Sequence, residues 1–303
     1  MTQSPGDQAT TEAVCFRHTN RPTNVRCQNC EKPICSDCMR ESPVGYRCPD
    51  CAPQRRFAMA DDLMVTKTLI GVNVFVFVLG LLLQVVDGAM GNFMTQNAST
   101  LIDKGALIAS RCTEGIVQGG VLQTCTKEIG VAEGEWYRLI TGGFLHSGLL
   151  HLAFNMYFIW MFGQLLEPSL GRLRFGLLYF VSLLGGSIGA LLYSASNVPT
   201  VGASGAAFGL LGAALVVSRL RRIDSLTNDL LVLAAINFAI GFIPGFNISI
   251  GGHVGGFVVG ALAGWVAFGP LARNRSAVVA ILSAAIVVLF IGGILVANVR
   301  AGV

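Results

Sequence analysis

Long apolar runs alternate with short polar connections over most of this 303-residue chain. Seven of the runs are predicted to be helices, at 64–86, 147–166, 173–195, 204–219, 227–243, 250–269 and 276–298. Most approach the roughly 20 residues that a helix needs to cross a bilayer. The fourth and fifth are close to the lower limit of about 17 residues, so we expect surrounding protein to shield their ends. The pattern predicts an all-α polytopic membrane protein.

The composition agrees with a membrane location. Hydrophobic residues make up 53% of the chain and charged residues 13%, against roughly 25% charged residues in a typical soluble domain. The net charge is +4, but the basic residues stand at the ends of the apolar runs and form no stripe. We therefore expect a lipid bilayer and no nucleic acid as a partner.

Basic residues in the short connections predict the orientation. They occur on alternate connections, at Arg172 and Arg174, at Arg219, Arg221 and Arg222, and at Arg273 and Arg275. The connections 196–203 and 244–249 contain no Lys or Arg. By the positive-inside rule, the N-terminus is cytoplasmic, the loop 87–146 is external, and the C-terminus lies outside after seven spans. The polar start of the chain does not resemble a signal peptide, and we expect the plasma membrane as the location.

Four pairs of metal-binding residues precede the first apolar run, and each pair is separated by two residues. The eight residues are Cys15, His18, Cys27, Cys30, Cys35, Cys38, Cys48 and Cys51. This spacing and number predict two tetrahedral zinc sites. A disulfide framework is the alternative, but seven cysteines and one histidine fit it poorly in a reducing cytoplasm. Spacing alone allows the pairs to combine either sequentially or alternately. Four-ligand sites of this kind are structural, and zinc would stabilise a module too small for a large core.

Two further cysteines, Cys112 and Cys125, fall in the predicted external loop. An oxidising exterior allows a disulfide between them to persist, and two free thiols are the alternative. The sequence predicts five segments along the chain. They are a disordered N-terminus at 1–12, a zinc module at 13–54, a linker at 55–63, a six-span core at 64–270, and a seventh span with a short tail at 271–303.

Ser204 is the candidate nucleophile, in the segment Gly202-Ala203-Ser204-Gly205 at the start of the fourth span. A serine between glycines in an apolar context also serves simply to pack membrane helices. Three histidines, His146, His151 and His253, lie in or beside the spans. Ionisable groups at membrane depth are costly and favour a functional interpretation, although a lone histidine bonded to a carbonyl is the plain alternative.

The predicted topology brings these groups to one level. Spans two, four and six all begin at the outer face, so His151 and Asn155, Ser204, and His253 converge there. Glycines recur every fourth residue in span six, and span four offers a matching face of small residues, which predicts close packing of the two helices. These two rows are Gly252, Gly256, Gly260 and Gly264, and Gly205, Gly209 and Ala213.

The chemistry that such a site supports is acyl transfer. His253 would take the Ser204 hydroxyl proton as general base, and no acidic residue near span six is available to complete a triad. Phe208, one turn after Ser204, would hold the imidazole by stacking, or it is an ordinary core aromatic. The Ser204 amide, His151 and Asn155 would donate hydrogen bonds to an oxyanion.

Four motifs together resemble the rhomboid family of intramembrane serine proteases. They are Trp136-Tyr137-Arg138, HSGLLHLAFN from His146 to Asn155, GASG from Gly202 to Gly205, and GHVGG from Gly252 to Gly256. The resemblance covers about residues 64–270. In one respect the chain departs from the family, because Tyr137 separates a Trp and an Arg that the family commonly has adjacent.

The resemblance implies a rhomboid-like six-helix core followed by one extra transmembrane helix. It implies a Ser204–His253 dyad, an oxyanion hole that includes His151 and Asn155, supporting roles for His146 and Gly202, and cleavage of single-span membrane proteins near the outer face without a catalytic cofactor. The N-terminal module resembles a B-box-like zinc-binding module, which implies alternate pairing of the ligands. We expect a cytoplasmic protein as its partner.

Two other functions remain open. A catalytically inactive relative would bind membrane proteins and escort or retain them. A transporter is a further alternative, which we disfavour because we expect no acidic residue inside a span.

Overall fold

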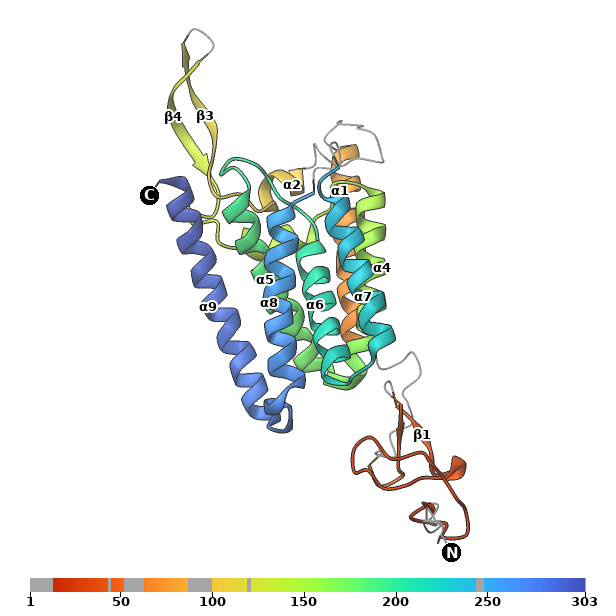
Figure 1. Ribbon diagram of the computed structural model, residues 1–303. Coiled ribbons are helices and arrows are strands. Elements are labelled where there is room, and N and C mark those ends of the chain that lie inside the picture. The colour runs from red at the N-terminus through yellow and green to blue at the C-terminus, as the bar shows by residue number, and fades with distance from the viewer. Residues whose placement is uncertain are drawn as a thin grey trace, which may run out of the picture. The chain divides into compact units, whose positions relative to one another are not determined.

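The computed structural model describes residues 13–42, 45–51, 63–86, 100–118, 121–243 and 248–302. The chain divides into two compact units, Met1–Asp61 and Asp62–Val303, and Figure 1 shows the elements of both. The predicted disordered segment 1–12, all but the last residue of the predicted linker 55–63, and residues 87–99 of the external loop lie outside the described residues.

The N-terminal unit contains little regular structure. Its elements are a 3-10 helix η1 (Ser36–Cys38) and the short strands β1 (Arg40–Glu41) and β2 (Tyr46–Arg47), which pair in antiparallel fashion. Its buried core consists almost entirely of cysteines, with Ile34 as the other fully buried member. Such a core buries little apolar surface, so the unit depends on the chemistry of its cysteines for stability.

The second unit is a bundle of helices (Figure 1). The long helices of its described part are α1 (Met64–Val86), α4 (Leu149–Leu170), α5 (Arg172–Tyr193), α6 (Ser204–Leu220), α7 (Asp224–Ile240), α8 (Ile250–Phe268) and α9 (Arg275–Ala301). Each lies within a few residues of a predicted span, because the apolar runs that define the spans also end at Gly, Pro or polar residues that stop helices.

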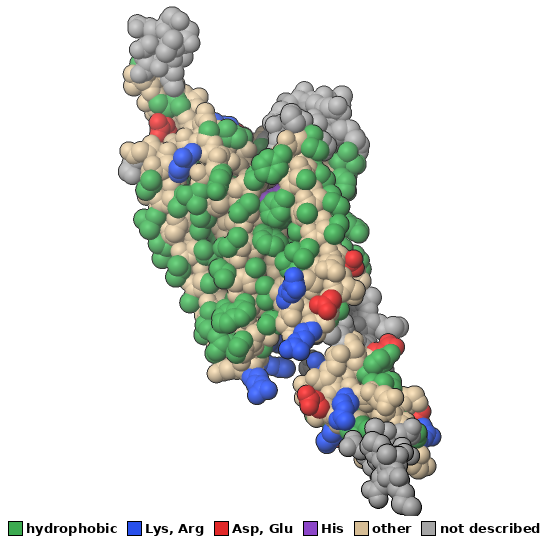
Figure 2. Space-filling view, in the orientation of Figure 1, with side chains coloured by type: hydrophobic (Ala, Val, Ile, Leu, Met, Phe, Trp, Pro, Cys, Tyr) green, Lys and Arg blue, Asp and Glu red, His purple; other side chains and the backbone are tan. Residues whose placement is uncertain are grey.

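Five of these helices, α1, α4, α5, α8 and α9, are long and apolar enough to cross a membrane. Helix α6 is apolar but has only 17 residues, and α7 also has 17 residues and begins at Asp224. Figure 2 shows hydrophobic side chains spread over the visible face of the bundle. The chain is a multi-pass membrane protein, and the two short helices are those that the sequence predicted to be short.

Helices α5 and α6 form the centre of the bundle. Helix α6 packs most extensively against α8 and also contacts α4, α5 and α7. In α5, 72% of the most apolar 18-residue stretch is buried inside the protein, whereas in α9 only 17% of the corresponding stretch is buried. Helix α9 packs mainly on α5, and the 3-10 helix η4 (Pro270–Arg273) leads into it. The extra C-terminal helix is therefore peripheral to the core.

The expectation that no acidic residue lies inside a span was wrong. Helix α4 extends to Leu170 and so includes Glu167, which is 1% exposed. Its carboxylate accepts hydrogen bonds from the amides of Val65 and Thr66 at 2.9 Å and from the Thr66 hydroxyl at 2.6 Å. Asp229 lies in α7 and is exposed. Glu167 is thus a cap for the first turn of α1, where negative charge is favourable.

The loop between α1 and α4 has structure of its own, at one end of the bundle (Figure 1). It contains α2 (Thr100–Gly105), the antiparallel strands β3 (Arg111–Gln118) and β4 (Val121–Ile129), α3 (Arg138–Thr141) and the 3-10 helix η3 (Gly142–Phe144). The sequence analysis predicted none of these elements. A disulfide joins Cys112 to Cys125 across the β3–β4 hairpin.

Candidate functional site

Ser204 is the first residue of α6 and lines a small cavity beside the structured loop. This cavity is lined by residues of η3, α5, α6 and α8 and of the two segments around Leu107 and Gly202. Its volume of about 30 Å³ gives room for one or two water molecules. Ser204 therefore combines a hydroxyl at a helix N-terminus with a place for water.

His253 lies in the first turn of α8 and is 8% exposed. Its ring stacks on Phe208 of α6 with centroids 3.9 Å apart and an angle of 18° between the planes. Phe208 in turn contacts Phe238 of α7 edge to face at 5.0 Å. The stacking that was one of two interpretations of Phe208 is present. Among the described residues, no hydrogen bond joins the Ser204 and His253 side chains.

Contacts between bare backbones bring α8 against α6. A Cβ atom built on Gly256 would lie 2.0 Å from the Gly205 carbonyl oxygen, and one on Gly260 would lie 2.2 Å from that of Gly209. A Cβ on Gly264 would lie 2.7 Å from the Cα of Ala213. The two rows of small residues therefore pack on each other, and the structure adds which residues pair. No side chain fits between the two helices at these positions, so their backbones are in direct contact. Ser204 and His253 lie in the first turns of these two helices.

The fourth glycine of the row has a different neighbour. Gly252 is adjacent to Gly186 of α5, since a Cβ on Gly252 would lie 3.6 Å from the Gly186 carbonyl oxygen, and one on Gly186 would lie 2.8 Å from the Cα of Gly205. Helices α5, α6 and α8 therefore meet at three glycines directly beside the cavity.

His151 and Asn155 lie one turn apart at the start of α4. The Asn155 side-chain amide donates to the His151 carbonyl at 3.0 Å. A Cβ atom built on Gly202 would lie 2.6 Å from His151 Nε2 and 3.7 Å from Asn155 Nδ2. Gly202 also has a φ of 123°, which favours glycine. The structure thus brings His151, Asn155 and the segment before Ser204 together.

His146 lies just before α4, is 1% exposed, and packs edge to face on His151 with centroids 5.1 Å apart. Neither of its ring nitrogens has a hydrogen-bond partner among the described residues. His146 and His151 therefore lie together beside the segment that leads to Ser204.

The N-terminal unit brings the eight predicted metal ligands into two groups. The first is Cys15, His18, Cys35 and Cys38, and the second is Cys27, Cys30, Cys48 and Cys51. Within each group the ligand atoms lie within 4.8 Å of one another. The pairs therefore combine alternately, and the sequential arrangement that spacing also allowed is wrong.

The donor sets of both groups fit zinc, which prefers four thiolate or imidazole ligands in a closed tetrahedral site. Burial, together with hydrogen bonds and charge from the neighbouring Cys15 and Cys35, raises the pKa of the Cys38 thiol to about 11. A raised pKa favours the protonated thiol, whereas a bound divalent metal ion would favour the thiolate, because the positive charge stabilises it.

Comparison with known protein families agrees with this geometry. A model described as the Rhomboid domain matches residues 133–270, the stretch that contains His146, His151, Ser204 and His253. A model described as the B-box zinc finger matches residues 10–43. Residues 133–270 are therefore similar to a rhomboid domain. Cys48 and Cys51 of the second ligand group lie beyond the zinc-finger match.

Curated relatives are rhomboid proteins. Rhomboid protease GluP of Bacillus subtilis (strain 168) is 40% identical over 115 residues, which is 37% of this chain and 22% of that protein. RHOMBOID-like protein 6, mitochondrial, of Arabidopsis thaliana is 36% identical over 164 residues, or 50% of this chain and 45% of the relative. Inactive RHOMBOID-like protein 8 of the same plant is 36% identical over 117 residues. The matched region is thus less than half the length of each of these relatives.

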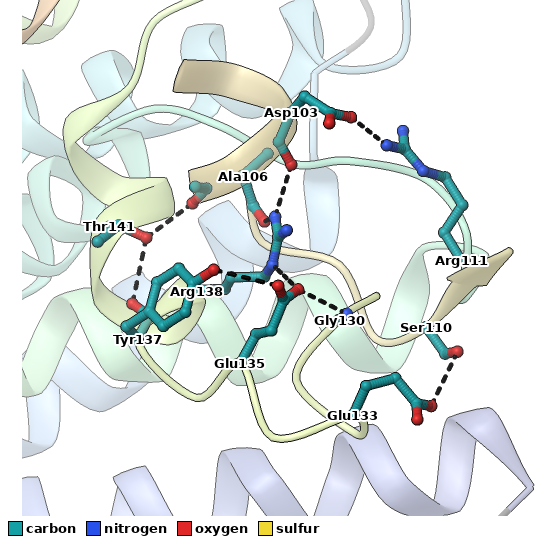
Figure 3. Close-up of polar contacts among 11 residues, drawn as sticks. Asp103, Ala106, Ser110, Arg111, Gly130, Glu133, Glu135, Tyr137, Arg138 and Thr141 are labelled. Atoms are coloured by element: carbon teal, nitrogen blue, oxygen red, sulfur yellow. Dashed lines mark hydrogen bonds and ion pairs between the residues drawn. The ribbon is translucent and has the colours of Figure 1, made fainter. Parts of the chain in front are cut away.

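The segment that matches the Rhomboid domain model also contains Arg138, whose contacts the sequence did not indicate. Arg138 is 1% exposed and pairs with Glu135 at 2.7 Å (Figure 3). Its guanidinium also donates to the carbonyls of Asp103 at 3.0 Å and Ala106 at 2.9 Å, while Glu135 accepts from the Gly130 amide at 2.9 Å. Arg138 therefore ties α2 to the segment that follows β4. The Trp-Tyr-Arg motif contains Arg138, but the two carbonyls that it bonds lie 35 and 32 residues away in the sequence.

A short strip of backbone links this loop to the segment before Ser204. Leu107 and Thr200 exchange two hydrogen bonds, at 3.0 and 2.8 Å, and the Ser196 carbonyl accepts from the amides of Ala109 and Ser110. The Gly202 amide donates to Gly142 at 2.9 Å. The structured loop thus fixes the path of the chain into α6.

Proposed function

We propose that the protein is an intramembrane serine endopeptidase that cleaves transmembrane segments of other membrane proteins. The proposal is supported mainly by one arrangement: Ser204 stands at a helix N-terminus beside a water-sized cavity, at the end of a side-chain-free contact between α6 and α8. The relatives named as rhomboid proteases support the same activity.

In the proposed reaction, His253 accepts the proton of the Ser204 hydroxyl as its Oγ attacks the scissile carbonyl carbon. The protonated imidazole then gives that proton to the leaving amine. Water from the cavity hydrolyses the acyl-enzyme, again with His253 as base. Phe208 keeps the imidazole plane in place by stacking, which replaces the orienting role of the acidic residue in a triad but not its negative charge.

The tetrahedral intermediate would receive hydrogen bonds from the Ser204 amide, His151 and the Asn155 side chain. Each good donor in such a site is worth about 3–4 kcal/mol. Gly202 allows the backbone to pass close to His151. His146 packs against the His151 ring and supports its position.

We assign residues 64–270 to the protease core, 13–54 to the zinc module, and 271–303 to the additional helix with its tail. The positive-inside rule supports a cytoplasmic N-terminus and an external C-terminus, with cleavage near the outer face of the plasma membrane. Suitable substrates are single-span proteins with small or helix-breaking residues near the scissile bond, because such a segment unwinds readily into the site.

The test is cleavage of a transmembrane reporter by the purified protein in lipid. Wild type should release the product, while Ser204→Ala and His253→Ala should not. Ser182→Ala is the matched control, because Ser182 is a buried helix serine whose hydroxyl donates to the Leu178 carbonyl of its own helix, and it should cleave as wild type does. Undiminished cleavage by Ser204→Ala would refute the proposal.

A second candidate function is noncatalytic binding of membrane proteins. One relative is named inactive, and the Ser204 and His253 side chains are not hydrogen-bonded to each other among the described residues. This function predicts that wild type binds reporter segments without cleaving any member of a broad panel, and that Ser204→Ala binds them equally well.

For the N-terminal unit we propose two structural zinc ions and a cytoplasmic protein partner. Elemental analysis of the full chain should give two zinc ions per molecule. Cys38→Ser and Cys30→Ser should each lower the count by one, since the two residues belong to different groups. A count unchanged in both variants would contradict the assignment. Pull-down with and without zinc would test for the partner.

A further inference from the structure

Ser147 lies between His146 and the first turn of α4, and the proposed mechanism gives it no role. Its Oγ atom lies 3.1 Å from Nδ1 of His151. Among the described residues, this is the hydrogen bond of the Ser147 side chain, and it meets the nitrogen of His151 that faces away from Gly202. Ser147 is therefore placed to determine whether the other ring nitrogen of His151, Nε2, carries a proton.

The Nε2 atom of His151 faces the segment that precedes Ser204. A Cβ atom built on Gly202 would lie 2.6 Å from it, so only a glycine leaves room for the ring. The side-chain nitrogen of Asn155 borders the same place. An oxyanion donor in this position has to carry a proton on Nε2.

A neutral imidazole carries a single proton, and the hydrogen bond at one nitrogen decides which one holds it. If Nδ1 were protonated, it would donate to Ser147 and leave Nε2 as an acceptor, and the serine proton would have no acceptor among the described residues. If the Ser147 hydroxyl donates to Nδ1, the hydroxyl is satisfied and Nε2 carries the proton. The second arrangement satisfies both groups.

Among the described residues, no neighbouring side chain competes with Ser147 for a hydrogen bond to the His151 ring. His146 packs its ring against His151, but its two nitrogens have no hydrogen-bond partner among the described residues. Asn155 contacts the backbone carbonyl of His151 and not its ring. Ser147 is thus the described group that bonds the His151 imidazole.

We propose that Ser147 is a positioning residue that holds His151 in the tautomer with the proton on Nε2, so that this N–H donates to the oxyanion. The inference rests on the proposed protease function for its consequence, but the tautomer itself is measurable without any cleavage. Because Ser147 acts through His151, its removal should slow the chemical step and leave substrate binding nearly unchanged.

The first experiment is nitrogen NMR of the protein labelled at histidine, with the His151 signals assigned by their loss in His151→Ala. Wild type should show a protonated Nε2 and an unprotonated Nδ1. Ser147→Ala should show a mixture of the two tautomers, and Ser147→Thr, which keeps the hydroxyl, should resemble wild type. A protonated Nδ1 in wild type would overturn the proposal whether or not the protein is a protease.

The second experiment measures kcat and KM for the transmembrane reporter. Ser147→Ala should lower kcat by about 10- to 100-fold, the usual effect of losing a group that orients a functional histidine, with KM within about twofold. Ser147→Thr should restore kcat, and Ser182→Ala should have no effect. In a His151→Ala background the Ser147→Ala change should cause no further loss, since the two residues act as one unit.

The outcomes separate the two proposals. If Ser204→Ala still cleaves, the protease proposal fails, while the NMR result still decides the tautomer. If Ser204→Ala is inactive but Ser147→Ala matches wild type, or loses as much activity in the His151→Ala background as in wild type, then Ser147 has no positioning role.

Discussion

The contact between α6 and α8 makes a sharp prediction about Gly260. A Cβ atom built there would lie 2.2 Å from the oxygen, 2.3 Å from the Cα and 2.4 Å from the carbonyl carbon of Gly209. Ordinary contacts begin near 3.4 Å. All three atoms belong to the backbone, so no rotation of a side chain relieves the overlap. The substitution Gly260→Ala requires the two helices to separate by roughly 1 Å at this point.

The expected loss of stability follows from two opposing effects. Alanine favours a helix over glycine by about 0.5–1 kcal/mol, whereas overpacking a tight interface costs about 1–3 kcal/mol. Because the overlap involves only backbone, we place the cost at the upper end and expect a net loss of about 2 kcal/mol. A displacement of about 1 Å at a catalytic site lowers activity by as much as about 100-fold, so cleavage should fall more than stability suggests.

Gly292 provides the matched control. It is also a helical glycine, in α9, but a Cβ atom built on it would lie 3.8 Å from the Ile188 side chain. Thermal unfolding in detergent, followed by circular dichroism, should show a lower Tm for Gly260→Ala and an unchanged or higher Tm for Gly292→Ala. Reporter cleavage should fall only in the first. If Gly260→Ala matched Gly292→Ala in both measurements, the inferred packing of α6 on α8 would be wrong.

Three further predictions concern other parts of the chain. Glu167→Gln keeps one acceptor oxygen but places its NH2 group against the donors of either Val65 or Thr66, so it should lower stability by about 1.5–3 kcal/mol; an unchanged Tm would contradict the cap on α1. Removal of zinc by a chelator should unfold the N-terminal unit, seen as rapid proteolysis within 13–51, and leave the Tm of the helical bundle unchanged because the bundle is a compact unit with a core of its own; a module that stays resistant without metal would refute this. Replacing Cys112 and Cys125 by serine releases a constraint worth about 3 kcal/mol for a loop of this length, so hydrogen exchange should accelerate in β3 and β4 but not in α5 or α8; exchange as slow as in wild type would show that the disulfide is not what orders the hairpin.

Sequence patterns located the helices well because their information is local. At membrane depth, a long apolar run satisfies its backbone hydrogen bonds within itself by forming a helix. Helices α1 and α4 to α9 therefore lie close to their predicted ranges. The ends were less certain. Helix α4 continues past its predicted end to Leu170, and this extension carries Glu167 into the helix, where it bonds to residues 101 and 102 positions away.

The candidate site was only partly accessible from sequence. The repeat of glycines in α8 predicted which helix it would contact, and the structure pairs Gly256 with Gly205 and Gly260 with Gly209. No local pattern indicated the bonds of Leu107 with Thr200, because irregular strands that pair across about 90 residues leave no periodic trace. The sequence also did not indicate the Arg138 network, because the guanidinium bonds carbonyls 35 and 32 residues away.

The sequence by itself determined the class of protein, the positions of the helices and the ligands of the metal module, since length, hydrophobicity and short spacings are properties of neighbouring residues. Only the tertiary structure decided which ligand pairs combine, that Glu167 caps α1, and that Ser147 meets His151 beside the segment leading to Ser204. Such contacts depend on how distant segments meet in the packed protein, and that geometry is set by all the helices together.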